Sequence, residues 1–444
     1  MGLLRFVALL VCAPLPLLAS LAAHAQILSL EEALAIALAN NTSVTNAELQ
    51  REAAQDDVEA LRTARYPRLD VNGRVSHHLE DQEYVFEEGV WGDYPVIGEV
   101  PAQDITIKSN SGTTQQVSAG ITQPLAQQYR LGLSIEQGEV REDMATEFVR
   151  LTQQDVARVV KEEYFNILQS QSTLATTREA IVFYTSLVEL VSNYVSQRIA
   201  FEYELLETQA RLARRELEAN SQMNRLSTQK ERMNTLLSRD INTPFRVSEL
   251  PAEVLVTGGL DDAVATAISQ RPEVRESELK VKDAELGYDI KQAEYLPDLD
   301  LSLRYTRLYD TALIPDTEAY VGLRARWEIF DWGRKKSELA SKNARIQSAE
   351  NSARNLKDRV AIDVRRSFRS IAEAEQAVEV ARLSQAAARD KLRVLMNQYK
   401  QQATLLQNVL DAESDLDRAN NAYNRAVLSV YRAQAELERA VGDI

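Results

Sequence analysis

Two stretches near the end of the chain repeat apolar positions at alternating spacings of three and four residues. The first contains Ile371, Ala374, Val378, Ala381, Gln385, Ala388, Leu392 and Leu395, and the second contains Val409, Ala412, Leu416, Ala419, Tyr423, Ala426, Val430, Ala433, Leu437 and Ala440. This seven-residue repeat predicts helices that coil around each other in a left-handed sense. The polar segment 397–404 lies between the two stretches and predicts the turn of a long antiparallel helical hairpin. At 1.5 Å per residue, the arm from Gly333 to Asn397 is expected to be roughly 95 Å long.

Four shorter segments alternate apolar and polar residues with a period of two, which is typical of β-strands. Their apolar positions are Leu69, Val71 and Val75; Val117, Ala119, Ile121 and Leu125; Leu299, Leu301, Leu303 and Tyr305; and Val321, Leu323, Ala325, Trp327 and Ile329. The apolar faces of the helical segments are expected to pack against each other, so few apolar side chains remain to cover these strands.

The two halves of the chain repeat the same order of residues. With an offset of 230 positions, segment 30–33 matches 260–263 and Pro67 matches Pro297. With an offset of 204 positions, segment 117–240 aligns with 321–444 without a gap. The offsets differ by 26 positions, so one insertion lies between residues 77 and 116 of the first half. The chain is therefore expected to be a tandem duplication of a unit with the order helix, strand, loop, strand, long helical hairpin.

This duplication divides the chain into seven segments. Arg5, the apolar run after it and the small residues around 23–25 predict a secretory signal peptide at 1–25. The first repeat is expected to place an N-terminal helix at 26–66, a β-hairpin with a long extracellular loop at 67–126 and a long helical hairpin at 127–240. A linker and the second-repeat helix follow at 241–296, then a second β-hairpin at 297–330 and a second long helical hairpin at 331–444. A lipidated start at Cys12 is the weaker alternative, because residues 9–11 lack the small side chains expected before such a cysteine.

Composition excludes several functional classes. The net charge of −15 argues against a nucleic-acid partner. Cys12 is the single cysteine, so no disulfide is expected in the mature chain. The sequence has no Gly-rich phosphate loop, and only His77 and His78 remain after the expected cleavage. We therefore expect neither a cofactor nor an enzyme.

Four strands are too few to close a barrel, because the smallest membrane-spanning barrels need about eight. One reading is a small half-buried sheet in a soluble protein. The other is an outer-membrane barrel completed by several copies of the chain, since an open sheet edge is not tolerated within a bilayer. The secreted, cysteine-free and duplicated chain favours the barrel.

The insertion in the first half contains acidic residues, glycines and prolines without a strong period, which predicts an exposed polar loop at 81–99. His77 and His78 precede it, and with Glu80 and Asp81 they form a weak candidate metal site that lacks the spaced ligands of a built one. Six aromatic residues are candidates for anchors at the membrane–water interface, and for the three tryptophans among them ordinary core packing is the alternative. They are Trp91, Trp327, Trp332, Tyr305, Tyr309 and Tyr320.

Taken together, several segments resemble the TolC-like outer-membrane efflux proteins, the outer-membrane channel components of tripartite efflux and type I secretion systems. They are the repeated start at 30–33, the strand starts Pro67-x-Leu69 and Pro297-x-Leu299, the segment 327–334, the turn from Tyr399 to Asn408-Val409-Leu410-Asp411-Ala412, and the closing residues 440–442. The resemblance spans 28–444.

It implies a mainly α fold with β structure, in which a homotrimer builds a 12-stranded outer-membrane β-barrel continuous with a long periplasmic α-helical barrel. Such a trimer contacts outer-membrane lipid in a Gram-negative bacterium and extends into the periplasm. It is expected to pass small molecules or secreted substrates from an inner-membrane transporter and a periplasmic adaptor protein to the cell exterior. A periplasmic structural coiled-coil protein without a pore is the alternative, but it gives no reason for four symmetrically placed strands.

The resemblance also assigns roles to the two hairpin turns, 194–206 and 399–410. They are expected at the periplasmic end, where Arg198, Phe201, Gln402 and Thr404 would contact the adaptor. The chain departs from the family here, because Gln402 replaces a usual glycine and Thr404 stands where a cation is common.

Carboxylates after the second turn narrow the entrance in this family. Asp411 fits one of these positions, whereas Asn408 replaces the other. The offset of 204 places Glu204 and Glu207 opposite Asn408 and Asp411, so the first half still supplies acidic residues. Tyr399 is expected to hydrogen-bond Glu204 in the closed entrance. Hydrated charges near a helix end are the simpler interpretation of the same acids.

Overall fold

The computed structural model describes residues 26–80, 82–110, 112–250, 259–309 and 315–443. The expected signal peptide at 1–25, with Cys12, lies outside these residues. The chain forms two compact units, which we describe separately. The turn unit contains the residues up to Asn41, Val156–Val256 and Ile371–Ala435, and the sheet unit contains Thr42–Asp155, Thr257–Ser370 and Glu436–Ile444.

The turn unit is built from long helices and a small parallel sheet. Its helices are α1 (Leu30–Asn40), α4 (Glu202–Leu236), the second part of α3 (Gln128–Ser196), and most of α8 (Leu406–Val441) with the end of α7 (Arg334–Lys400). Strands β1 (Gln26–Leu28) and β8 (Phe245–Val247) pair in parallel. The buried Tyr164 hydroxyl lies 3.0 Å from the carbonyl oxygen of Leu28 and 2.9 Å from that of Ser248, which fastens this small sheet to α3.

The sheet unit contains the remaining helices, α2 (Thr42–Thr63), α5 (Leu260–Gln270) and α6 (Pro272–Ala293). Each repeat was expected to begin with one helix, but each begins with two. The break falls at Asn41 and at Arg271, which both have extended backbone angles. Pro272 explains the second break, because it has no backbone N–H to continue α5 and disfavours helical angles at the residue before it.

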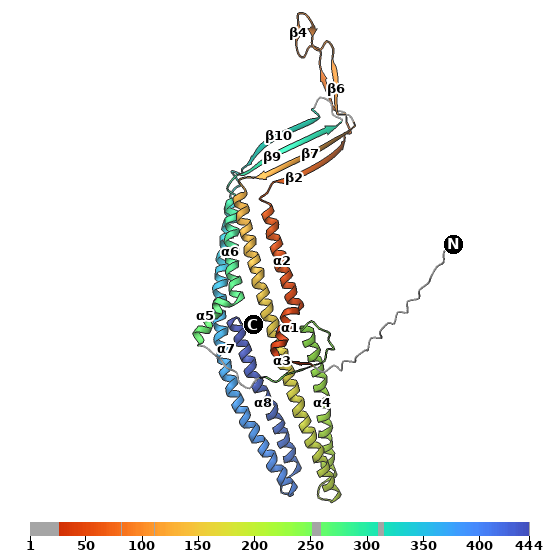
Figure 1. Ribbon diagram of the computed structural model, residues 1–444, viewed down its shortest axis with the longest axis vertical. Helices are drawn as coiled ribbons and strands as arrows, with labels where there is room; N and C mark the ends of the chain where they lie inside the picture. Colours follow the sequence, from red (N-terminus) through yellow and green to blue (C-terminus); the bar gives the residue numbers. More distant parts are fainter. Residues whose placement is uncertain (1–25, 81, 111, 251–258, 310–314, 444) are drawn as a thin grey trace, which may run out of the picture. The chain divides into compact units, whose positions relative to one another are not determined.

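One four-stranded antiparallel sheet has the order β10-β9-β7-β2, and its strands lie side by side in Figure 1. The strands are β2 (Arg68–His77), β7 (Thr113–Pro124), β9 (Asp298–Tyr309) and β10 (Thr317–Arg326). All four segments with a period of two therefore form strands. The last was expected to continue through Trp327 and Ile329, but β10 ends at Arg326.

One face of this sheet is apolar across all four strands. Leu69 pairs with Ile121, Ile121 with Leu303, and Leu303 with Val321, so the four side chains form one row. All four are exposed, Leu69 and Val321 by 69% and 71%. The expectation that little of the chain covers these strands is confirmed for the described residues.

The opposite face carries polar side chains. Asp70 pairs with Gly120 and Gly120 with Arg304, and the Arg304 guanidinium lies 3.8 Å from the Asp70 carboxylate. A Cβ atom at Gly120 would lie 3.3 Å from the Asp70 carboxylate, so glycine leaves room for this ion pair.

The insertion in the first half forms strands of its own. Strand β3 (Gln82–Phe86) pairs with β6 (Ile105–Asn110), and β4 (Asp93–Tyr94) pairs with β5 (Gly98–Glu99). The prediction of a loop at 81–99 is therefore wrong for these strands, whereas its exposure is confirmed at most of the described positions. The pattern of the sequence did not predict them, because β4 and β5 have two residues each and β3 is separated from β6 by the segment 87–104.

All six aromatic candidates for interface anchors are exposed, Trp332 by 87%. Core packing within the chain, the alternative for the three tryptophans, is therefore wrong. Among the described residues, no helix is both long and apolar enough to cross a membrane.

Candidate functional site at the two helical turns

The two turns of the turn unit have the same backbone. After α3, Ile199 N–H donates to the carbonyl of Tyr194 at 2.8 Å, and after α7, Ala403 N–H donates to that of Gln398 at 2.8 Å. Each turn holds one residue in the left-handed region, Arg198 at φ 60° and Gln402 at φ 58°. These features define a helix C-terminus normally closed by glycine, here built twice without one.

Both turns rest on one hydrophobic cluster. Its buried residues are Tyr184, Leu187, Val191, Tyr399, Leu406, Val409 and Leu410. The rings of Tyr194 and Tyr399 lie 5.8 Å apart, and the Tyr194 hydroxyl donates to the carbonyl of Lys400 at 3.1 Å. The two hairpins therefore meet at their turns through side chains from both.

The acids of the first turn are engaged locally. The Glu204 carboxylate accepts a hydrogen bond from the Phe201 backbone N–H at 2.8 Å, which caps the start of α4. Glu207 pairs with Arg211 at 3.1 Å along the same helix. Their charges are thus partly balanced within the first hairpin.

The second turn leaves its polar residues on the surface. Asn408 donates to the Thr404 hydroxyl at 2.9 Å, and the exposed Asp411 carboxylate accepts from Gln407 at 2.8 Å. Asp411 has no basic partner comparable to Arg211 among the ion pairs of the described residues.

The expected hydrogen bond between Tyr399 and Glu204 is wrong. The Tyr399 hydroxyl is buried, and it has no hydrogen-bond partner among the described residues. Glu204 instead caps its own helix. Burial, with the charge of Glu204 next, raises the pKa of Tyr399 to about 12, so the hydroxyl stays protonated.

A buried polar cluster that the sequence did not reveal joins the two hairpins. The Tyr184 hydroxyl on α3 donates to the Glu413 carboxylate on α8 at 2.5 Å. Arg215 on α4 lies 3.7 Å from Glu413 and 3.0 Å from Asp417. We call Tyr184, Arg215, Glu413 and Asp417 the polar cluster.

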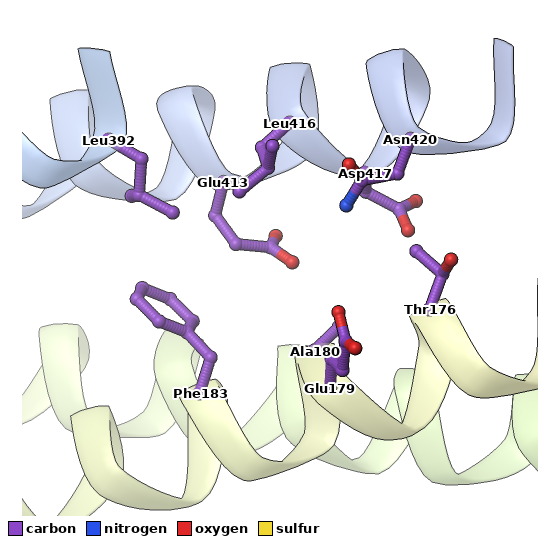
Figure 2. Close-up of a pocket in the computed structure, with 9 residues that line it drawn as sticks. All are labelled: Thr176, Glu179, Ala180, Phe183, Leu392, Glu413, Leu416, Asp417 and Asn420. Atoms are coloured by element: carbon purple, nitrogen blue, oxygen red, sulfur yellow. The ribbon is translucent and has the colours of Figure 1, made fainter. Parts of the chain in front are cut away.

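Two acids of the polar cluster border a cavity of about 110 Å³, which Figure 2 shows between α3 and α8. In that view Glu413 extends from α8 toward Phe183 and Glu179 of α3, and Asp417 extends toward Thr176. Burial raises the pKa of Glu413, because desolvation outweighs the hydrogen bond from Tyr184 and the charge of Arg215.

A signal for this cluster exists in the sequence. Arg211 and Arg215 on one hairpin, and Glu413 and Asp417 on the other, are each separated by four residues and so share one helix face. The spacing does not say which faces meet, because that depends on how the hairpins pack.

The candidate metal site at His77 and His78 belongs to the sheet unit and not to the turns. His77 and His78, far away in sequence, contact the hydroxyls of Thr113 and Thr114 at 3.1 and 3.0 Å. No group of three or more potential metal-binding side chains occurs within the described ranges. The site can bind, exclude or attract ions, and it can hold two helical hairpins together.

The sequence model of the outer membrane efflux protein family matches residues 33–239 and 263–443. The chain belongs to this family. As an outer membrane efflux protein it is a transport duct of the outer membrane and not an enzyme. No curated protein matches the sequence.

Solved structures share the fold. CusC, described for its folding and transmembrane channel formation, has a TM-score of 0.78 at 17% identity, covering 94% of this chain and 92% of its own. VceC from Vibrio cholerae has a TM-score of 0.76 at 15% identity, with 93% and 96% covered. CmeC of Campylobacter jejuni has a TM-score of 0.77 at 14% identity, with 93% and 85% covered. The outer membrane efflux protein therefore has the fold of known outer-membrane channels.

Proposed function

We propose that three copies of the chain form one exit duct, with their sheets joined in a 12-stranded barrel in the outer membrane. The observation that carries this proposal is the open sheet with an exposed apolar row from Leu69 to Val321. Both edge strands, β2 and β10, lack a partner on one side within the described sheet. In a bilayer these backbone groups need partners, and neighbouring copies supply them.

The polar face of the sheet would then line the bore. Asp70 and Arg304 balance each other there, so the lining is hydrated without a large net charge. A substrate in such a bore crosses the membrane without meeting hydrocarbon. Small molecules or secreted proteins are the substrate class, and an inner-membrane transporter supplies the energy.

The two turns would form the periplasmic entrance, with Glu204, Glu207, Asn408, Asp411 and Tyr399 as its gate. A periplasmic adaptor would contact Arg198, Phe201, Gln402 and Thr404. Phe201 is 68% exposed and stacks on Tyr203 at 5.8 Å, which gives an adaptor a preformed apolar surface. The left-handed Arg198 and Gln402 fix the direction of both turns.

Cross-linking tests the trimer directly, because the mature chain is expected to have no cysteine. Val71→Cys on β2 is combined in turn with a cysteine at each position of β10. These strands are opposite edges of one sheet, so a disulfide between them must join different copies. We expect at least one pair to give linked dimers and trimers in the outer-membrane fraction, whereas each single variant gives no trimer. Failure at all positions, with a monomer in detergent, would refute the proposal.

A further inference from the structure

The end of α4 and the strand that follows it bring three cations together. Lys230 lies near the end of α4, Arg239 lies in the turn after it, and Arg246 lies on β8. The Lys230 ammonium is 5.8 Å and the Arg239 guanidinium carbon 4.7 Å from the centre of the Phe245 ring, which is 2% exposed. Two cations therefore lie over one buried ring. We call Lys230, Arg239 and Arg246 the basic cluster.

The turn after α4 fixes the guanidinium of Arg239. Its Nε donates a hydrogen bond to the side-chain oxygen of the buried Asn234 at 2.6 Å. The amide nitrogen of Asn234 donates in turn to the carbonyls of Ile241 and Thr243, at 2.7 and 3.0 Å. The Arg239 Nη2 is buried and has no hydrogen-bond partner among the described residues. The arginine is thus held in place with part of its hydrogen-bonding capacity unused.

No acid balances the basic cluster. In the described part of the chain, none of its three members forms an ion pair with a carboxylate. Burial lowers the pKa of Lys230, and the charge of Arg246 lowers it further. Burial also lowers the pKa of Arg239. Arg215 shows the contrast, because burial opposes its charge too, but the acids of the polar cluster raise its pKa. The basic cluster is therefore an uncompensated positive charge in a chain whose net charge is −15.

The second repeat ends its helix without these cations. The offset of 204 positions aligns Lys230 with Gln434 and Arg239 with Asp443. The two helix ends nevertheless share a hydrogen bond, because residues 239 and 443 each donate their backbone N–H to the carbonyl five positions earlier. The cations are therefore not needed to end the helix, and their role lies elsewhere.

We propose that the basic cluster binds a phosphate group, either free phosphate or a phosphate monoester. Arginine and lysine are the side chains that donate charge-assisted hydrogen bonds to phosphate. A phosphate monoester carries a charge of about −1.5 to −2 at pH 7, so it balances more of the cluster than a carboxylate does. Arg246 is exposed, and a ligand can reach it from solvent. The inference does not depend on the proposed barrel, because the whole cluster lies within the turn unit.

Titration calorimetry of the full-length protein in detergent tests the site, with inorganic phosphate, glycerol 3-phosphate and acetate as probes at equal ionic strength. We expect saturable binding of phosphate and at least tenfold weaker binding of acetate. Tighter binding of glycerol 3-phosphate would identify a monoester as the ligand, and tighter binding of inorganic phosphate would identify the free ion; the inference stands in both cases. It is overturned if neither phosphate binds, or if acetate binds as tightly.

A pair of matched variants tests which cations take part. Arg246→Gln removes an exposed side chain, so the protein should stay folded by circular dichroism while phosphate binding weakens at least tenfold. Arg232→Gln is the control, because Arg232 is exposed on α4 two positions after Lys230 and does not face the same side of the helix. An equal loss of binding in both variants would show a general attraction of anions and would overturn the inference.

Lys230→Gln separates binding from a structural role. Without phosphate, the variant should unfold at a higher temperature than the parent protein, because burial and the charge of Arg246 both disfavour the ammonium and lower the pKa of Lys230. With saturating phosphate the order should reverse, because a ligand stabilises most the protein that binds it most tightly. A variant that is less stable than the parent by the same amount in both conditions has lost only packing, and this result would overturn the phosphate site.

Discussion

The two repeats share a backbone and differ in charge. Both turns use the same left-handed position, Arg198 in the first and Gln402 in the second. On the helices that follow, Arg211 of the first repeat aligns with Asp415 of the second. Duplication kept the hydrogen-bonding of the turns, while substitution gave each copy a different set of charges.

That difference in charge allows the two repeats of one chain to bind each other. Two identical helices would present like charges at matching positions. Here Arg215 of the first repeat instead pairs with Glu413 and Asp417 of the second repeat. The polar cluster is therefore a contact between unlike halves. Because the polar cluster is largely buried, the loss of one of its charged members is expected to destabilise the turn unit.

Removing the cation of the polar cluster should have the largest effect. Arg215→Ala removes the cation that pairs with Glu413 and Asp417, and Glu413 is only 4% exposed. Breaking a buried pair in this way costs about 3 kcal/mol of unfolding free energy. Denaturant unfolding followed by circular dichroism measures it. Arg214→Ala, at the exposed neighbouring position, is the control and should change stability by less than about 0.5 kcal/mol. Equal effects from both variants would contradict the role of the cluster.

The pH dependence of the cluster should have a defined sign. Since burial raises the pKa of Glu413, the folded chain binds its proton more tightly than the unfolded chain does. The stability that this proton contributes is complete below the unfolded pKa, about 4.3, and is lost as pH rises through the folded pKa. Glu413→Gln should remove this dependence. Unfolding free energies of both proteins between pH 4 and 8 measure it, and parallel curves would contradict the prediction.

The sequence predicted what depends on local pattern. Alternation at 299–305 located β9, and the polar segment 397–404 located the second turn, because both signals lie within a few neighbouring residues. It did not predict the contact of Tyr184 with Glu413, which are separated by 229 positions and meet only when the hairpins pack. The hydrogen bond predicted between Tyr399 and Glu204 is wrong, because the competing cap formed by Glu204 depends on where α4 begins.

Relaxing a turn should have a smaller effect of the opposite sign. Gln402→Gly removes the cost of a left-handed backbone, so stability should rise by about 1 kcal/mol. Gln401→Gly next to it serves as the control, since position 401 is not left-handed and gains nothing from glycine. Thermal unfolding measures both variants. A loss of stability in Gln402→Gly would show that its side chain contributes more than its backbone costs.

Substitution of Asp411 should have the smallest effect, a change in ion selectivity. It tests the difference in charge between the two turns most directly. Glu207 is paired with Arg211, whereas the exposed Asp411 carboxylate accepts a hydrogen bond from the amide of Gln407 and has no ion pair with a described residue. Two unit charges 8 Å apart in water interact by about 0.5 kcal/mol, which corresponds to roughly a twofold change in ion preference. Asp411→Ala should therefore lower the cation preference of single channels about twofold without changing the fold. The double variant Glu207→Ala with Arg211→Ala should do less, because it removes a paired anion and cation together and leaves the local net charge unchanged. If the two variants change selectivity equally, or neither does, the acids at this entrance are hydrated surface charges and the second turn has no special part in selecting ions.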